Sequence, residues 1–200
     1  GHGQSSAEGS GWTLADLGKD VISVLDGFGI ETAQFCGISM GGLTGLWLAI
    51  HRAERFSRLT VSNTAAKIGN AAAWQVRAEI VRSEGMGSIA DSAASRWFTP
   101  AFCERRPNTV ARLTDTLRHS HAEGYAKCCD VLATADVRAL VHQADVDVQV
   151  IGAKHDTVTT GADAQWLAQN LPRASLAVLP GAHIANIEAT AEFNRLLRPA

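Results

Sequence analysis

The stretch that decides the fold is Gly37-Ile38-Ser39-Met40-Gly41, a G-x-S-x-G motif. It follows an apolar run over residues 33–38 that has no helical period, and a helical pattern starts at Gly41. This context predicts a buried strand, a sharp turn that carries the serine, and a helix. The hydroxyl of Ser39 would project from the turn. Both flanking glycines would let the strand and the helix approach where a side chain would clash.

Strands and helices alternate on both sides of this turn. Upstream, Thr13 and Asp16 form a capping pattern at the start of a helix that Gly27 and Gly29 end. The alternation favours an α/β fold with a parallel sheet. The other elements that we expect are helices over 41–50, 162–170 and 190–197 and strands over 59–61, 146–152 and 175–179.

Residues 66–136 differ from the segments on either side of them. Their apolar residues, such as Trp74 and Val81, recur at helical spacing, and no clear strand interrupts them. We therefore expect a small helical cap over 66–136, inserted into an α/β core that is formed by 1–65 and 137–200.

The composition describes a chain that can build one core. Hydrophobic residues make up 46% of the 200 residues and charged residues 19%, and 18 Lys and Arg against 20 Asp and Glu leave a net charge of −2. This profile predicts one compact soluble domain and excludes a disordered chain. The near-neutral charge argues against a nucleic-acid partner. No apolar stretch approaches the ~18 residues of a membrane span, so we expect no membrane partner.

Nothing in the sequence points to a metal or a cofactor. The cysteines, Cys36, Cys103, Cys128 and Cys129, lack the spacing of a zinc site or of a C-x-x-C pair. The motifs G-x-x-x-x-G-K-[ST], G-x-G-x-x-G and H-E-x-x-H, which bind nucleotides or zinc, are absent too. We expect no metal, no cofactor and reduced thiols in the cytoplasm, with the adjacent Cys128 and Cys129 packing on a helix.

A serine nucleophile needs a base and an acid that holds this base in one tautomer. Asp156 follows the strand expected over 146–152, and His183 follows the strand over 175–179. Both therefore leave the carboxyl ends of strands, where the active sites of open parallel sheets lie. The chain order of serine, acid and histidine is that of α/β-hydrolases. We predict that Ser39 is the nucleophile, His183 its base and Asp156 the orienting acid.

The amide of Met40 is the predicted oxyanion donor, because it lies at a helix N-terminus next to the serine. The competing polar residues do not combine a strand end with the required chain order. We expect the remaining histidines to be surface or structural residues and the acids near element ends to be solvated. These are His2, His51, His119, His121, His142, His155, Asp145, Asp147 and Asp163.

More specific patterns are spread along the whole chain. They are Gly-His-Gly-Gln-Ser at 1–5, Cys-Gly-Ile-Ser-Met-Gly-Gly at 36–42, Asn-Thr-Ala-Ala-Lys-Ile-Gly at 63–69, Arg-Trp-Phe-Thr-Pro at 96–100, Glu-Gly-Tyr-Ala at 123–126 and His-Ile-Ala-Asn-Ile-Glu at 183–188. Together they resemble the 3-oxoadipate enol-lactonases of the α/β-hydrolase superfamily. The resemblance implies an α/β-hydrolase fold with a mostly parallel sheet and a small helical cap.

The same resemblance implies an activity. It is the hydrolysis of 3-oxoadipate enol-lactone to 3-oxoadipate without a cofactor, a cytoplasmic step in the β-ketoadipate pathway of aromatic catabolism. This small lactone carries a carboxylate, which a cation in the cap should meet. We assign that role to Arg96 and expect Trp74 and Trp97 to be apolar walls of the pocket. The alternative is that Arg96 is a solvated cap residue and that both tryptophans belong to the core.

The chain departs from the family pattern in two places. Prolines often follow the acid in the family, whereas Thr157 to Thr160 follow it here, so we expect a less rigid loop. The family also has a segment ahead of the Gly-His-Gly loop that holds the first strands and the loop with the second oxyanion donor. We expect these N-terminal strands to be missing from this chain. A lost donor typically costs ~10²–10³ in rate, and an uncovered sheet edge favours self-association.

Two further readings remain open from the residues. A related serine hydrolase would act on another small ester, lactone or carbon–carbon bond. A catalytically inactive fragment would bind a ligand or merely pack.

Overall fold

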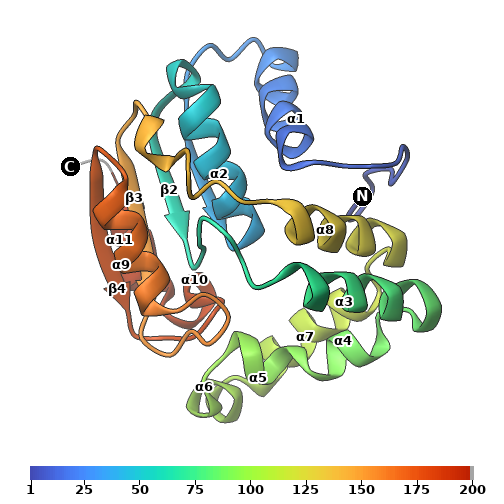
Figure 1. Ribbon diagram of the computed structural model, residues 1–200. Helices are drawn as coiled ribbons and strands as arrows, with labels where there is room; N and C mark the ends of the chain where they lie inside the picture. The colour runs from blue at the N-terminus through green and yellow to red at the C-terminus, as the bar shows by residue number, and fades with distance from the viewer. Residues whose placement is uncertain (199–200) are drawn as a thin grey trace.

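A parallel sheet of four strands organises the chain, whose residues 1–198 are described by the computed structural model (Figure 1). The strands pair in the order β1-β2-β3-β4, each parallel to the next. All lie where the sequence predicts a strand, although β2 is longer than expected. Their bounds are Ala33–Ile38 for β1, Phe56–Ser62 for β2, Val148–Ala153 for β3 and Ala174–Leu179 for β4.

The prediction of a buried strand over residues 33–38 is wrong, because β1 is only partly buried. Every residue of β3 is buried, as expected for a central parallel strand that is covered on both faces. In β1 the side chains of Gln34 and Cys36 are exposed, while Gly37 is buried. Alternate residues of a strand point to opposite faces, so one face of β1 is open. Burial depends on which elements cover a strand, and the apolar run itself carries no such information.

Helices cover both faces of the sheet. One face holds α1 (Leu14–Gly27), α2 (Met40–His51) and α9 (Gly161–Asn170), whose apolar residues share one core cluster with β2 and β3. The other face holds α10 (Ala185–Glu188) and α11 (Thr190–Leu197), which pack on the ends of β3 and β4. The expected helices are confirmed, and α10 is an additional short one.

The start and the packing of α1 follow from two local features. The capping box that Thr13 and Asp16 predict is present, with the Thr13 side chain bound to the Asp16 amide and the Asp16 carboxylate bound to the Thr13 amide. Further along, α1 approaches α2 so closely that a Cβ on Gly18 would overlap the Trp47 ring. The glycine therefore sets how close the two helices lie.

The segment between β2 and β3 is helical, as the spacing predicts, and we keep the name cap for residues 66–136. Its helices lie together beside the carboxyl end of β2 (Figure 1). The division of the chain into core and cap stays a prediction. The helices are α3 (Ala71–Glu84), α4 (Gly87–Asp91), α5 (Ala93–Trp97), α6 (Pro100–Arg105), α7 (Pro107–Arg118) and α8 (Ala122–Thr134).

The cap packs internally and against the loop that follows β4. Phe98 and Phe102 stack with ring centres 4.9 Å apart, and Ile184 and Ile187 from the core pack against their cluster. All the cysteines are free, and burial raises the pKa of Cys129 on α8 to about 12. Among residues 1–198, no helix combines the length and the apolar character needed to cross a membrane.

Candidate active site

Ser39 lies in a strained turn between β1 and α2. Its backbone has φ 54° and ψ −117°, a region that costs a non-glycine residue roughly 1–3 kcal/mol. Hydrogen bonds hold it there: the Ser39 amide donates to Ser62 O at 3.0 Å, and Ser39 O accepts from Thr64 Oγ1 at 2.7 Å and from Leu43 N at 2.9 Å. The turn therefore fixes the direction in which the hydroxyl projects.

The glycines around Ser39 have different roles. The predicted need for Gly37 is confirmed, because a Cβ there would overlap the carbonyl of Gly41. The same prediction is wrong for Gly41, where a Cβ would meet nothing within 4 Å. Gly42 is the second required position, since a Cβ would lie 2.7 Å from the Thr64 Cβ. The close approach is thus made by α2 against β1 and against Thr64, the second residue after β2.

The structure brings Ser39, His183 and Asp156 together at the carboxyl ends of β1, β4 and β3. Ser39 Oγ lies 3.0 Å from His183 Nε2, and His183 Nδ1 lies 2.9 Å from Asp156 Oδ2 and 3.1 Å from Oδ1. His183 and Asp156 are 5% and 6% exposed. With the Nδ1 proton donated to the carboxylate, Nε2 is the free acceptor for the serine hydroxyl.

Asp156 is surrounded by donors. Its carboxylate accepts from Asn63 Nδ2 at 2.9 Å, from Val158 N and Thr159 N at 2.8 and 3.0 Å, and from Thr159 Oγ1 at 2.9 Å. Burial alone would raise the pKa of Asp156, but the hydrogen bond and charge of His183 and these donors lower it to about 2. The acid is therefore ionised. Two of its donors are loop amides, which a proline at either position would lack.

Asn63 is a residue of this site that the sequence reasoning missed. It follows β2, is 1% exposed and has a positive φ of 45°. Its Nδ2 donates to Asp156 and, at 3.2 Å, to the carbonyl of Ala182, the residue before His183. Its Oδ1 accepts from Ser62 Oγ at 2.7 Å. The one available signal was its position directly after a strand, within the stretch at 63–69 that resembles the family.

Glu188 on α10 joins the histidine loop to the cap. Its carboxylate accepts from Ala182 N at 3.1 Å, from Thr99 N at 3.2 Å and from the Thr99 hydroxyl. In addition, Ile184 N donates to Trp97 O at 3.0 Å. Ala182, the residue before His183, is thus held at both of its backbone groups. Asn63 binds its carbonyl, and Glu188 binds its amide.

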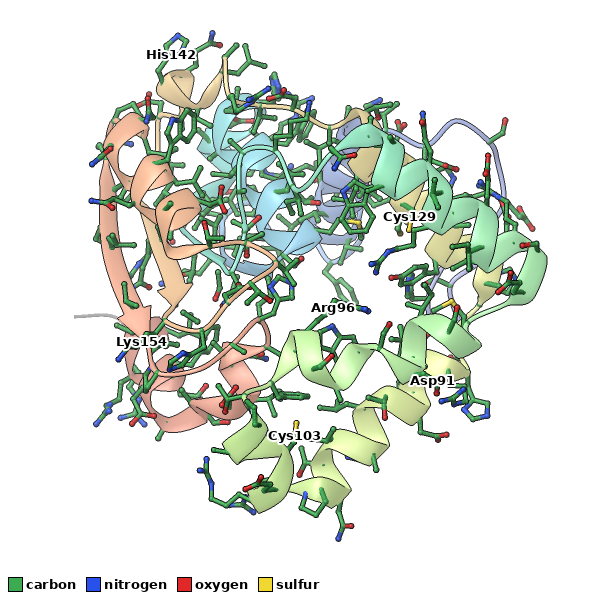
Figure 2. The ribbon with its side chains drawn as sticks, turned by 60° about the horizontal axis from the view of Figure 1, so that its bottom comes forward. Asp91, Arg96, Cys103, Cys129, His142 and Lys154 are labelled. Carbon is green, nitrogen blue, oxygen red and sulfur yellow. The ribbon has the colours of Figure 1, made fainter. Side chains whose placement is uncertain are left out.

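A cavity of about 350 Å³ opens in front of Ser39, between the cap and the core. The residues predicted to bind substrate, Trp74, Arg96 and Trp97, all line it together with His183. Figure 2 shows Arg96 extending from the cap toward this space. Trp74 and Trp97 also pack against core clusters, so the alternative that they are core residues stays open.

The sequence reasoning missed several lining residues. Arg77 on α3 and Tyr125 on α8 line the cavity, and Arg77 Nη1 donates to Tyr125 Oη at 3.4 Å. His2 is exposed, as expected of a surface residue, and it also lines the cavity. Burial, with the positive charges of the terminal amino group and His121, lowers the pKa of His2 and favours its neutral form.

The amide of Met40 is the first of α2, so it lies at the positive end of the helix dipole. This is the place that the sequence predicts for an oxyanion donor. Within residues 1–198 no group of His, Cys, Asp and Glu side chains has the arrangement of a metal site. The contacts from Asp156 through His183 to Ser39 suit nucleophilic attack by a hydroxyl with a histidine base.

Comparisons with known proteins place this arrangement in a family. A family model described as the alpha/beta hydrolase fold matches residues 1–190. The chain is 50% identical over 194 residues to the 3-oxoadipate enol-lactonase 2 of Acinetobacter baylyi, covering 97% of this chain and 73% of that protein. It is 40% identical over 193 residues to the 3-oxoadipate enol-lactonase 1 of the same organism, covering 96% and 72%.

A solved structure agrees with these relatives. The crystal structure of the enol-lactonase from Burkholderia xenovorans LB400 superposes with a TM-score of 0.95 at 39% identity, covering 98% of this chain and 75% of that chain. The predicted α/β-hydrolase fold is therefore confirmed, and the four parallel strands and the cap described above have direct counterparts in a solved protein.

Proposed function

We propose a lactone-hydrolysing function because this chain belongs to the α/β-hydrolase family and, within it, to the 3-oxoadipate enol-lactonases, which are carboxylic ester hydrolases. The proposed substrate is 3-oxoadipate enol-lactone, the product is 3-oxoadipate, and no cofactor takes part. One observation carries the proposal: the chain of hydrogen bonds from Asp156 through His183 to Ser39 ends in a cavity that a cap arginine lines. A cytoplasmic place in the β-ketoadipate pathway rests on the family resemblance alone.

The first chemical step forms an acyl-enzyme. His183 Nε2 accepts the proton of Ser39 while Oγ attacks the lactone carbonyl carbon. The Met40 amide stabilises the resulting oxyanion. When this intermediate collapses, the bond from the carbonyl carbon to the ring oxygen breaks, and the imidazolium returns its proton to the leaving enolate. The enolate is a better leaving group than an alkoxide, because its charge is delocalised. The enol that remains on the acyl chain tautomerises to the ketone.

Water completes the reaction. His183 takes a proton from water, hydroxide attacks the acyl carbon, and the bond to Ser39 Oγ breaks with the proton going back to the serine. One water is consumed for each lactone, and the product carries a second carboxylate. Asp156 stays ionised throughout and stabilises the imidazolium, which agrees with the pKa of about 2 given above.

The cap supplies the proposed substrate contacts. Arg96 meets the substrate carboxylate, and the rings of Trp74 and Trp97 form apolar walls. Arg96 is positioned for this by its own neighbours, since its Nη1 donates to Ser92 Oγ at 2.6 Å and its Nη2 to Ile89 O at 3.4 Å. The remaining N–H groups of the guanidinium are available to a ligand.

The test is turnover of 3-oxoadipate enol-lactone, followed by chromatography of 3-oxoadipate, for the chain and for three variants. Ser39→Ala should abolish turnover. Arg96→Ala should lower kcat/KM, while Arg112→Ala, an exposed cap arginine outside the cavity, should not. An unchanged kcat/KM for Arg96→Ala would discard the anchoring role.

A panel of other esters separates the alternatives. Hydrolysis of simple aryl esters without any turnover of the enol-lactone would sink the substrate assignment and favour a related serine hydrolase. An activated ester should give a burst of released alcohol from the original chain and none from Ser39→Ala. If both proteins release the same amount, the chain is a catalytically inactive fragment.

A further inference from the structure

Two arginines of the cap line the cavity in front of Ser39, and only one of them has a role so far. Arg77 lies on α3 and Arg96 on α5. None of the ion pairs among residues 1–198 includes either of them. Five residues further along α3, Arg82 by contrast pairs with Glu123 at 3.0 Å and with Asp130 at 2.5 Å. The cavity therefore holds two positive charges that form no ion pair with a carboxylate of the described residues.

The two guanidiniums influence each other. Burial, followed by the positive charge of Arg77, lowers the pKa of Arg96. Both side chains are half-buried, so water screens their repulsion only partly. Holding two like charges in one cavity costs free energy in the empty protein. A negatively charged ligand placed between them would relieve that cost.

Arg77 is held in place by aromatic residues. Its guanidinium carbon lies 5.2 Å from the centre of the Trp74 ring, a distance typical of a cation–π contact. The indole N–H of Trp74 donates to Ile68 O at 2.6 Å, which fixes the ring. In addition, Arg77 Nη1 donates to the hydroxyl of Tyr125. An arginine that is oriented in this way loses little conformational entropy when it binds a carboxylate.

We propose that Arg77 and Arg96 together form a carboxylate clamp and that Arg77 determines the preference of this site for anionic over neutral acyl substrates. The clamp takes a short acyl compound with a carboxylate at the end far from the reacting carbonyl. The identity of the substrate in this proposal rests on the proposed function. The preference of the clamp for a carboxylate follows from its two guanidinium groups alone. Dicarboxylates that resemble the product occupy the same clamp.

Selectivity is the first readout. The variants are Arg77→Gln, Arg77→Lys and, as the matched control on the same helix, Arg82→Gln. We measure kcat/KM for 3-oxoadipate enol-lactone and for a neutral aryl acetate. Loss of a hydrogen bond to a charged group corresponds to about ten- to a hundredfold. Arg77→Gln should lower the ratio of anionic to neutral kcat/KM by this factor, Arg77→Lys should lower it less, and Arg82→Gln should leave it unchanged.

Binding is the second readout and needs no turnover. Calorimetry of adipate binding to the Ser39→Ala protein should give a Kd that rises about ten- to a hundredfold when Arg77→Gln is added. Equal losses on both esters, or an adipate Kd that does not change, would overturn the clamp even if the lactone is the substrate. Weaker adipate binding in Arg77→Gln, without any lactone turnover by the original chain, would keep the clamp and refute the proposed function.

Discussion

Replacing Glu188 with glutamine tests whether one carboxylate couples the cap to the catalytic histidine. Glu188 accepts hydrogen bonds from Ala182 N at 3.1 Å and from Thr99 N at 3.2 Å, and it also accepts one from the Thr99 hydroxyl. Ala182 precedes His183, and Thr99 lies in the cap two residues after Trp97. Glu188→Gln keeps the size and one acceptor oxygen but removes the charge.

The magnitude follows from these three contacts. Hydrogen bonds to charged groups contribute ~1.5–3 kcal/mol, against ~0.5–1.5 for neutral pairs. Each contact should therefore weaken by about 1 kcal/mol. Because Glu188 is only half-buried, we expect the free energy of unfolding to fall by about 1–3 kcal/mol in all. For catalysis, a misplacement of ~1 Å costs on the order of 10² in rate, so a partial loosening of the His183 loop should lower kcat roughly tenfold.

The assay combines denaturant unfolding with steady-state kinetics at a temperature where every variant is fully folded. Glu192→Gln is the matched control, because this half-buried glutamate on α11 has Arg195, at 3.6 Å, as its one ion-pair partner among residues 1–198. In Glu188→Gln both kcat and KM should change, since the linked segment carries Trp97 and Arg96 as well as the contact to the histidine loop. A merely structural role would lower stability and leave both kinetic parameters where they were.

A double-mutant cycle of Glu188→Gln with Thr99→Val isolates the interaction between Glu188 and Thr99. Glu188 and Thr99 share two hydrogen bonds, so their effects on unfolding should be non-additive by about 1–2 kcal/mol. The coupling should also appear in kcat/KM. Additive effects in both quantities, or kinetics in Glu188→Gln within twofold of Glu192→Gln, would refute the reasoning that this carboxylate positions the histidine.

Three further outcomes follow from the geometry. Gly42→Ala should lower the free energy of unfolding by about 1–3 kcal/mol in urea, because its Cβ would meet Thr64, whereas Gly41→Ala should leave it unchanged or raise it by up to ~1 kcal/mol. Asp156→Asn should lower kcat on the order of 10⁴-fold. It should also lower the free energy of unfolding at neutral pH by about 2 kcal/mol, the contribution of the ionised acid. The original chain should lose the same contribution as the pH falls from about 4 to about 2. Thr13→Ala should lower the unfolding free energy by about 1 kcal/mol through the lost capping box, as measured by thermal or urea unfolding.

Local pattern predicts the elements of this chain well because each depends on its own residues. Helical spacing and the capping residues locate α1, α9 and α11, and short apolar runs locate the strands. Burial is predicted less well. The run that forms β1 looks the same as the run that forms β3, but only β3 has a neighbouring strand on each side. What covers a strand is decided by distant segments, which a local pattern does not contain.

The same distinction separates the site residues that were found from those that were missed. Ser39, Asp156 and His183 follow from chain order and from strand ends, both of which the sequence displays. Arg77 meets Tyr125 only because α3 and α8 pack side by side, 48 positions apart in the chain. Asn63 acts through its side-chain amide, but its partners Asp156 and Ala182 lie 93 and 119 positions further along the chain. Contacts of this kind, between residues far apart in the chain, are visible only in the three-dimensional structure.

The parallel register of the sheet explains how four distant segments build one site. Each strand ends at the same edge, and the residue or loop that follows delivers one group: Ser39 after β1, Asn63 after β2, Asp156 after β3 and His183 after β4. A slip of one residue in any pairing would turn the side chains of that strand to the opposite face. Asn63 links the loops that follow β3 and β4, because it binds both Asp156 and the carbonyl of Ala182 before His183. The amides of Ser39 and Asn63 continue the hydrogen bonds of the sheet, donating to Ser62 O and to Ile151 O, so a loss of strand register would also cost the catalytic geometry.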